Sequence, residues 1–124
     1  MKIYVSHSSK LDYGRLLYEP LKSSRLTAEH EFIFPHDGML KNSKEAIRGS
    51  NLLIADVSYS STGQGIELGW ADAFGIPVAC FFQDGTTPPS SLRLMGWNAA
   101  PYRSGDDLVA KIADVLGRAR RAAP

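Results

Sequence analysis

Two short apolar runs restrict the fold of this chain more than any other feature of its sequence. Residues 52–57 (LLIADV) and residues 77–82 (PVACFF) are almost continuously apolar over the length of one strand. A strand of this composition is covered on both faces, because neither face can be left in contact with water. Such strands occupy the centre of parallel sheets. We therefore predict that both runs are central strands of a parallel sheet.

Helical patterns alternate with apolar runs along the whole chain. The sequence also predicts strands at residues 2–6 (KIYVS) and 31–34 (EFIF), and helices at residues 10–24, 43–48 and 67–74, with a last helix opened by Ser104 and Asp107. This alternation predicts an α/β domain with an open parallel sheet of about five strands and helices on both faces. Pro20 lies inside the first helical pattern and should kink or end that helix.

Composition limits the classes of protein to which the chain can belong. Its 124 residues, 44% of them apolar, can form one core, so residues 1–124 are expected to be a single domain. The 14 Lys and Arg residues nearly balance 13 Asp and Glu, which argues against binding a nucleic acid polymer. The single cysteine, Cys80, can form neither a disulfide framework nor a metal knot, and no metal or cofactor is expected. A cytoplasmic protein without membrane association is predicted, because the chain has no signal pattern and no apolar run of ~20 residues.

Candidate site residues follow the carboxyl ends of the predicted strands, where open parallel sheets bind their ligands. The segments there are rich in Ser, Gly, His and Asp: SHSSK (6–10), PHDG (35–38), SYSSTGQG (58–65) and QDGTTPP (83–89). Glu67 comes shortly after the third segment. Cleavage of a C1′–N glycosidic bond passes through a sugar cation and requires a carboxylate at the anomeric carbon. Gly63 and Gly65 leave room for a sugar ring there, and the dipole of the predicted helix favours an ionised Glu67.

Glu67 also has a simpler interpretation. An acidic residue at the start of a helix complements the helix dipole without any role in catalysis. One detail disfavours a capping role, because a capping box needs Ser or Thr three residues earlier and position 64 is Gln. The residues alone leave the catalytic and the structural interpretation open.

The surroundings of Glu67 resemble a known family. Residues 56–78 (DVSYSSTGQGIELGWADAFGIPV) are similar to the nucleoside 2-deoxyribosyltransferase family, which includes nucleoside 5′-monophosphate N-glycosidases. Its hallmark is a glutamate in a Gly-x-Glu-Leu-Gly context, here residues 65–69, and its Leu-Met-x-Trp element resembles residues 94–97. The resemblance implies a flavodoxin-like fold, a catalytic Glu67 with Tyr4 beside it, and active sites that a neighbouring subunit completes. A homo-oligomer with shared active sites is thus expected.

The resemblance also bears on the substrate. In the relatives that hydrolyse monophosphates, the phosphate is held at the positions of Ser8, Lys10 and Ser61. The transferases that act on unphosphorylated nucleosides typically have an aspartate at the position of Ser61, and its charge would repel a phosphate. Serine donates a hydrogen bond instead, which favours a nucleotide as the small-molecule substrate. The same serines, taken singly, are also common turn and cap residues.

Two positions depart from the family pattern. Ser43 stands where the family has a second acid, which leaves proton transfer to the sugar or the base without its usual group. His36 and Asp37 follow the second strand and are candidates for the part of the site that holds the nucleobase. Such a His-Asp pair in a loop is often only part of a turn. Arg93 occupies the position at which, in the family, a neighbouring subunit contributes Ser or Asn to the active site. Its arginine either binds a phosphate across the subunit interface or is an ordinary surface charge.

Three functions therefore remain open. The first is N-glycosidic cleavage or transfer on a nucleoside or deoxynucleoside 5′-monophosphate. The second follows from YVSHSSKLDY (residues 4–13) and AIRGSNLLIADVSYSS (residues 46–61), which resemble a Toll/interleukin-1 receptor domain, and some of these domains cleave NAD. The third is a catalytically silent nucleotide-binding or signalling module, which the missing second acid supports. Fold-level similarity alone does not separate the three.

Overall fold

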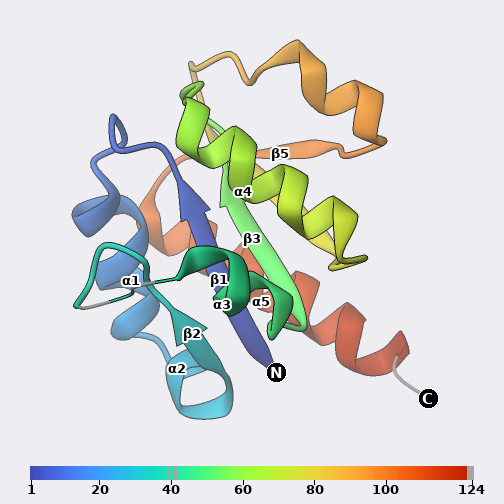
Figure 1. Ribbon diagram of the computed structural model, residues 1–124. Helices are drawn as coiled ribbons and strands as arrows, with labels where there is room; N and C mark the ends of the chain where they lie inside the picture. The colour runs from blue at the N-terminus through green and yellow to red at the C-terminus, as the bar shows by residue number, and fades with distance from the viewer. Residues whose placement is uncertain (39, 41, 123–124) are drawn as a thin grey trace.

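The computed structural model describes residues 1–38, 40 and 42–122, which contain one five-stranded sheet. Its strands all run parallel in the order β2-β1-β3-β4-β5 (Figure 1). They are β1 (Lys2–His7), β2 (Glu31–Ile33), β3 (Leu52–Asp56), β4 (Val78–Gln83) and β5 (Ala99–Tyr102). The predicted flavodoxin-like parallel sheet is confirmed. The two apolar runs form β3 and β4, and every residue of β3 is buried.

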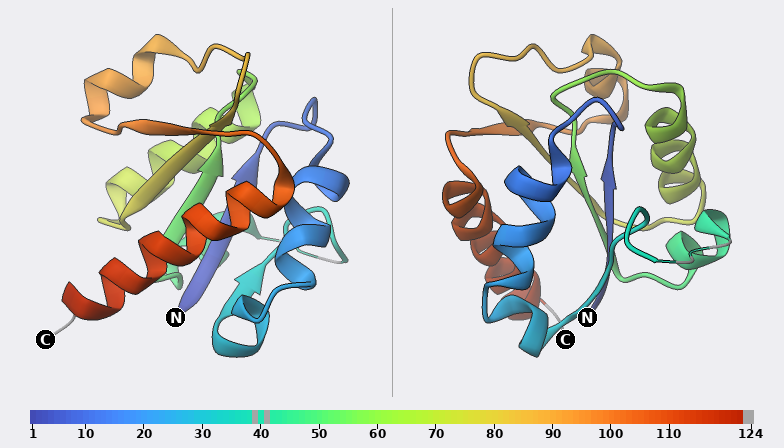
Figure 2. Two further views of the ribbon diagram at one scale, coloured as in Figure 1. Left: turned by 180° about the vertical axis from the view of Figure 1, so that it is seen from behind. Right: turned by 90° about the vertical axis from the view of Figure 1, so that its left-hand side faces the viewer.

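Helices cover both faces of the sheet, as predicted. One face carries the π-helix η1 (Gly14–Tyr18), α1 (Glu19–Lys22) and α5 (Gly105–Ala122), and the other carries α3 (Ser43–Arg48) and α4 (Thr62–Ala73) (Figure 2, right). The short helices α2 (Leu26–Glu29) and η2 (Ser90–Met95, a 3-10 helix) connect strands. No helix among the described residues is both long and apolar enough to cross a membrane.

Strand β1 contributes to two separate apolar cores. Successive side chains of a strand point to opposite faces of the sheet. Ile3 and Val5 accordingly belong to the core under η1, α1 and α5, whereas Tyr4 belongs to the core under α3 and α4. Ser6 is also fully buried and points to the same face as Tyr4. One strand thus places two hydroxyl groups beneath α4.

The first helical segment continues past Pro20, and it begins at Gly14 rather than at the predicted residue 10. The segment runs from Gly14 to Lys22, and a π-helix gives way to an α-helix just before Pro20. Proline has no N–H to donate to the carbonyl of Leu16, and it is tolerated here because it lies in the first turn of α1. The same carbonyl and the proline ring face Gly105, the first residue of α5.

Helix α4 begins at Thr62, so the prediction that it starts at Glu67 was wrong. Gly63 and Gly65 obscure its first turn in the sequence, because glycine disfavours helix interiors. The N-cap is Ser61, whose hydroxyl accepts a hydrogen bond from the Gln64 N–H at 3.2 Å. Glu67 therefore lies in the second turn, and the helix dipole acts mainly within the first. Neither capping nor dipole complementation explains this glutamate.

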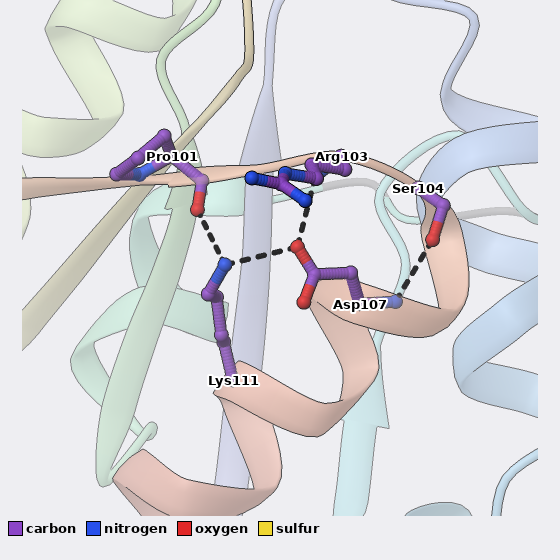
Figure 3. Close-up of polar contacts among 5 residues, drawn as sticks. All are labelled: Pro101, Arg103, Ser104, Asp107 and Lys111. Carbon is purple, nitrogen blue, oxygen red and sulfur yellow. Dashed lines mark hydrogen bonds and ion pairs between the residues drawn. The ribbon is translucent and has the colours of Figure 1, made fainter.

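Helix α5 opens with the predicted cap (Figure 3). The Asp107 N–H donates to Ser104 Oγ at 3.1 Å. Asp107 Oδ2 accepts from Lys111 Nζ and from the Arg103 N–H, both at 2.9 Å, and Lys111 also donates to the Pro101 carbonyl at 2.7 Å. The hydrogen bond from Lys111 lowers the pKa of Asp107. These bonds tie the first turn of α5 to the end of β5.

The contact between α5 and Pro20 predicts an asymmetry between two glycines. In Gly105→Ala the new Cβ would lie 2.5 Å from Pro20 Cγ and 3.2 Å from the Leu16 carbonyl oxygen. A proline ring and a backbone carbonyl cannot easily move away from the new Cβ. The free energy of unfolding should therefore fall by about 1–3 kcal/mol. In the control Gly117→Ala the nearest atom would be Arg121 Nη1 at 3.5 Å, and a gain of about 0.5–1 kcal/mol is expected. Urea unfolding measures both; two variants of equal stability would contradict the close contact.

Candidate functional site

A cavity of about 390 Å³ lies where the carboxyl end of β1 meets α4. It lies at the edge of the sheet where the sequence predicted a ligand site. Residues from four segments line it: the end of β1, the loop after β2, the start of α3, and α4 with its cap. These residues are His7, Ser9, His36, Ser43, Ser61, Gly63, Gln64, Ile66, Glu67 and Trp70.

Glu67 is held from the sheet by two hydroxyl groups. The Tyr4 hydroxyl donates to Oε2, and Ser6 Oγ donates to Oε1 at 2.9 Å. Both donors come from β1, where their spacing of two residues turns them to the face that α4 covers. The structure therefore brings Tyr4 and Glu67 together and adds Ser6, which the sequence did not single out as a site residue.

The environment of Glu67 acts on its ionisation in two directions. Burial raises the pKa of the carboxyl group, while the hydrogen bonds from Tyr4 and Ser6 and the nearby His36 oppose that rise. Burial and the bond to Glu67 raise the pKa of Tyr4 above its ordinary value. Tyr4 consequently stays protonated at neutral pH and keeps donating to Glu67. The result is a carboxylate whose charge is offset by hydrogen bonds rather than by an ion pair.

The loop after β2 and the start of α3 form one side of the cavity. His36 and Ser43 line it, and the side chain of Ser43 opposes the rise in the pKa of Tyr4. Asp37, the neighbour of His36, forms an ion pair with Lys22 and does not line the cavity. The structure thus brings His36 to Glu67 and leaves Asp37 at the surface.

The proposed phosphate residues occupy different places. Ser61 and Gly63 line the cavity, and Lys10 borders an adjoining hollow that also includes Ser61. Ser8 is only 1% exposed, and its Oγ accepts the Lys10 N–H at 3.1 Å. Ser8 therefore stabilises the turn that carries Lys10, while its neighbour Ser9 reaches the cavity.

Two further candidates lie away from Glu67. Gly65 is not among the residues that line the cavity, and it borders a small hollow beside Leu68 and Pro89. Arg93 is exposed on η2 and borders a separate hollow of about 500 Å³ that Phe82 and Trp97 also line. Within one chain, the structure does not bring Arg93 to the Glu67 cavity.

The sequence did not predict a network of hydrogen bonds around His7. The Ser8 carbonyl can only accept, so His7 Nδ1 donates to it, at 3.0 Å, and Nε2 is left to accept from the Tyr18 hydroxyl at 2.7 Å. The Tyr18 hydroxyl in turn accepts the His36 N–H at 3.2 Å, and the His7 ring stacks on Tyr13 with 4.4 Å between ring centroids. These roles hold for the neutral ring, which is the form present at neutral pH because burial lowers the pKa of His7. Only the position of His7 after a strand signalled a role, because its partners come from η1 and the loop after β2.

Trp70 and Ile66 complete the cavity from α4. Trp70 is partly buried against the core under α4, and Ile66 is half exposed. No sequence pattern distinguishes Trp70 from an ordinary core tryptophan. Among the described residues, no three His, Cys, Asp or Glu side chains are grouped in the way that a metal ion requires.

Comparison with known proteins finds similarity in structure but not in sequence. No family model matches the chain, and no curated protein matches it. A solved structure of the Clostridium botulinum CMP N-glycosidase BcmB is similar, with a TM-score of 0.65 over 91% of this chain and 99% of that chain. The two sequences are 18% identical over this alignment. At that identity the similarity shows a shared fold.

The neutral, buried His7 predicts a pH-dependent stability. Because its pKa is lowered by folding, the unfolded chain binds more protons than the folded one below pH ~6.5, so the free energy of unfolding should fall as the pH decreases from there. His7→Gln removes the titrating group, and urea unfolding at pH 7.5 and pH 5.5 should show a smaller difference than for the parent chain. His30 also has a lowered pKa, so His30→Gln serves as a parallel measurement. An unchanged pH dependence in His7→Gln would rule out the contribution of His7.

Proposed function

We propose that this protein cleaves the N-glycosidic bond of a nucleoside or deoxynucleoside 5′-monophosphate, with Glu67 acting at the anomeric carbon. The observation that supports this most is a half-buried carboxylate, held by Tyr4 and Ser6, that lines a cavity beyond the strand ends. A volume of about 390 Å³ is within the range of small-molecule sites. The protein of the same fold named CMP N-glycosidase agrees with this substrate class.

The chemistry needs a negative charge where positive charge develops. As the C1′–N bond breaks, its electron pair leaves with the base and the sugar becomes an oxocarbenium-like cation. Glu67 stabilises that cation or attacks C1′ to form a glycosyl-enzyme, which water or a second base then resolves. The departing base needs a proton. His36 and Ser43 are the polar cavity residues that take the place of the second acid, and the imidazole of His36 is the better proton donor.

The phosphate is proposed to bind at the other end of the cavity. Helix α4 begins there, so its first N–H groups and its dipole favour an anion. Ser61 and Gly63 line this end, and Lys10 lies beside Ser61 across the adjoining hollow. Ser8 contributes indirectly, through the turn that holds Lys10.

A homo-oligomer with shared sites is the second part of the proposal. Helix η2 exposes Leu94 to 86% and Met95 to 41%, next to the hollow that Phe82 and Trp97 line. An apolar protrusion and an apolar hollow on the same element suit a two-fold contact, in which each copy fills the hollow of the other. Arg93 also borders this hollow, and the proposal that it reaches the partner's substrate rests on the family resemblance. A strictly monomeric and active protein would contradict this role of Arg93.

The first prediction concerns Glu67 itself. Incubated with a panel of mononucleotides and NAD, the protein should release free base from a mononucleotide, and Glu67→Gln should lower the rate at least roughly a hundredfold, because the anomeric cation loses its counter-charge. Chromatography of the products measures both. Glu45→Gln is the matched control, since Glu45 pairs with Arg48 on the surface of α3.

The panel also separates the other functions. Nicotinamide release from NAD without mononucleotide cleavage would select a Toll/interleukin-1 receptor-like activity. Nucleotide binding without any released base would select a silent module. Equal loss of activity in Glu67→Gln and Glu45→Gln would contradict the assignment of Glu67.

The second prediction tests the phosphate end without disturbing the helix cap. In Ser61→Asp the carboxylate keeps the N-cap of α4, because aspartate caps as well as serine, but it repels a phosphate. The preference for a monophosphate over its nucleoside, measured as the ratio of kcat/KM values, should fall by at least roughly tenfold. Lys10→Ala should lower the same ratio, and Lys44→Ala on α3 is its control. A parent chain that turns over nucleoside and monophosphate equally would refute the phosphate site.

A further inference from the structure

Ser6 holds Glu67 from a position that has no contact with solvent. It is 0% exposed on β1, and its partner in the neighbouring strand β3 is the buried residue Ala55. Its hydroxyl donates to Glu67 Oε1 at 2.9 Å, while Tyr4 takes Oε2. Both oxygens of one carboxylate are therefore held from the same strand.

This arrangement determines which side of the carboxylate is left free. Each carboxylate oxygen has two acceptor positions, and the hydroxyl groups of β1 fill one on each oxygen from the sheet side. The remaining positions face away from β1, where Glu67 lines the cavity. A single donor would leave the carboxylate free to rotate about its last bond, whereas two donors two residues apart on a rigid central strand restrain its plane.

We propose that Ser6 is a positioning residue for Glu67, whose hydroxyl restrains the plane of the carboxylate so that its free acceptor positions point at the anomeric carbon. This inference rests on the proposed function of Glu67. Ser6 does not touch the substrate, because Glu67 lies between it and the cavity. The titratable groups around Glu67 are Tyr4 on β1, Tyr18 on η1 and His36 after β2. None of them replaces the bond that Ser6 makes to Oε1.

The test is Ser6→Ala, with Ser6→Thr to restore the hydroxyl. A lost hydrogen bond to a charged group should raise the pKa of the Glu67 carboxyl by about one unit. The acid limb of the kcat/KM profile should move to higher pH by the same amount, since Glu67 must be ionised. The value of kcat should fall roughly tenfold with little change in KM. Ser6→Thr should restore kcat and the position of the acid limb.

A second readout does not depend on activity. The ¹³C resonance of the Glu67 carboxyl, assigned with Glu67→Gln, titrates with the pKa of that group in a labelled protein. Ser50→Ala is the matched control, because Ser50 is also a buried serine, 5% exposed, that donates to the Ala46 carbonyl at 2.7 Å away from the cavity. It should leave the Glu67 titration unchanged.

The outcomes distinguish the two proposals. If the parent chain cleaves no glycosidic bond, the proposed function fails. A raised Glu67 pKa in Ser6→Ala would still show that the Ser6 hydroxyl binds the Glu67 carboxylate. An unchanged Glu67 titration and an unchanged pH profile in Ser6→Ala would overturn the role of Ser6. A lower kcat without any shift of the acid limb would overturn it as well, because a general structural loss would explain that result.

Discussion

Burial of β1 on both faces is the constraint from which the rest of the site follows. Its odd-numbered residues Ile3 and Val5 pack under η1, α1 and α5, while Tyr4 and Ser6 turn to α4. Buried hydroxyl groups need partners, because an unpaired one costs roughly 1–3 kcal/mol. Glu67 provides a partner for both. The same bonds that satisfy the strand offset the burial of the glutamate, so the fold and the candidate site are stabilised by the same contacts.

The two loops that border the cavity are also connected through the interior. His7 bonds to the Ser8 carbonyl, and through the Tyr18 hydroxyl it is linked to the backbone of His36. The turn that carries Lys10 and the loop that carries His36 are thereby attached to one neutral imidazole. This arrangement gives a short, irregular part of the chain a defined position, which a site built from loops requires.

Ser61 illustrates how one residue can serve both the fold and the proposed chemistry. Its hydroxyl accepts the Gln64 N–H and so begins α4, and the same cap lines the cavity at the anion-favouring end of that helix. Gln64 uses its side chain elsewhere, donating to the Asp56 carbonyl at the end of β3 at 2.7 Å. The helix that carries Glu67 is therefore attached to the central strand as well as to its own cap. Since one fold hosts many functions, the proposal depends on these side chains rather than on the similarity of fold.

The parallel sheet, the helices on both faces and the region of the site could all be predicted from the amino-acid sequence. These features depend on local patterns: apolar runs, helical spacing and cap residues are visible over a few positions. The resemblance to a family then pointed to Tyr4 and Glu67, which the structure brings together. It did not show that α4 begins at Thr62, because two glycines conceal the first turn.

Which of several similar side chains contact one another depends on the three-dimensional packing of the chain. Among neighbouring serines, Ser6 reaches Glu67, Ser8 caps a turn and Ser9 lines the cavity, because the pleat and the turn direct each one differently. Asp37 forms an ion pair with Lys22, fifteen residues away in sequence, and does not line the cavity. Such choices depend on packing between segments that are distant in sequence. No local pattern contains that information, whereas the strands and helices that bring these residues together could be predicted from local patterns.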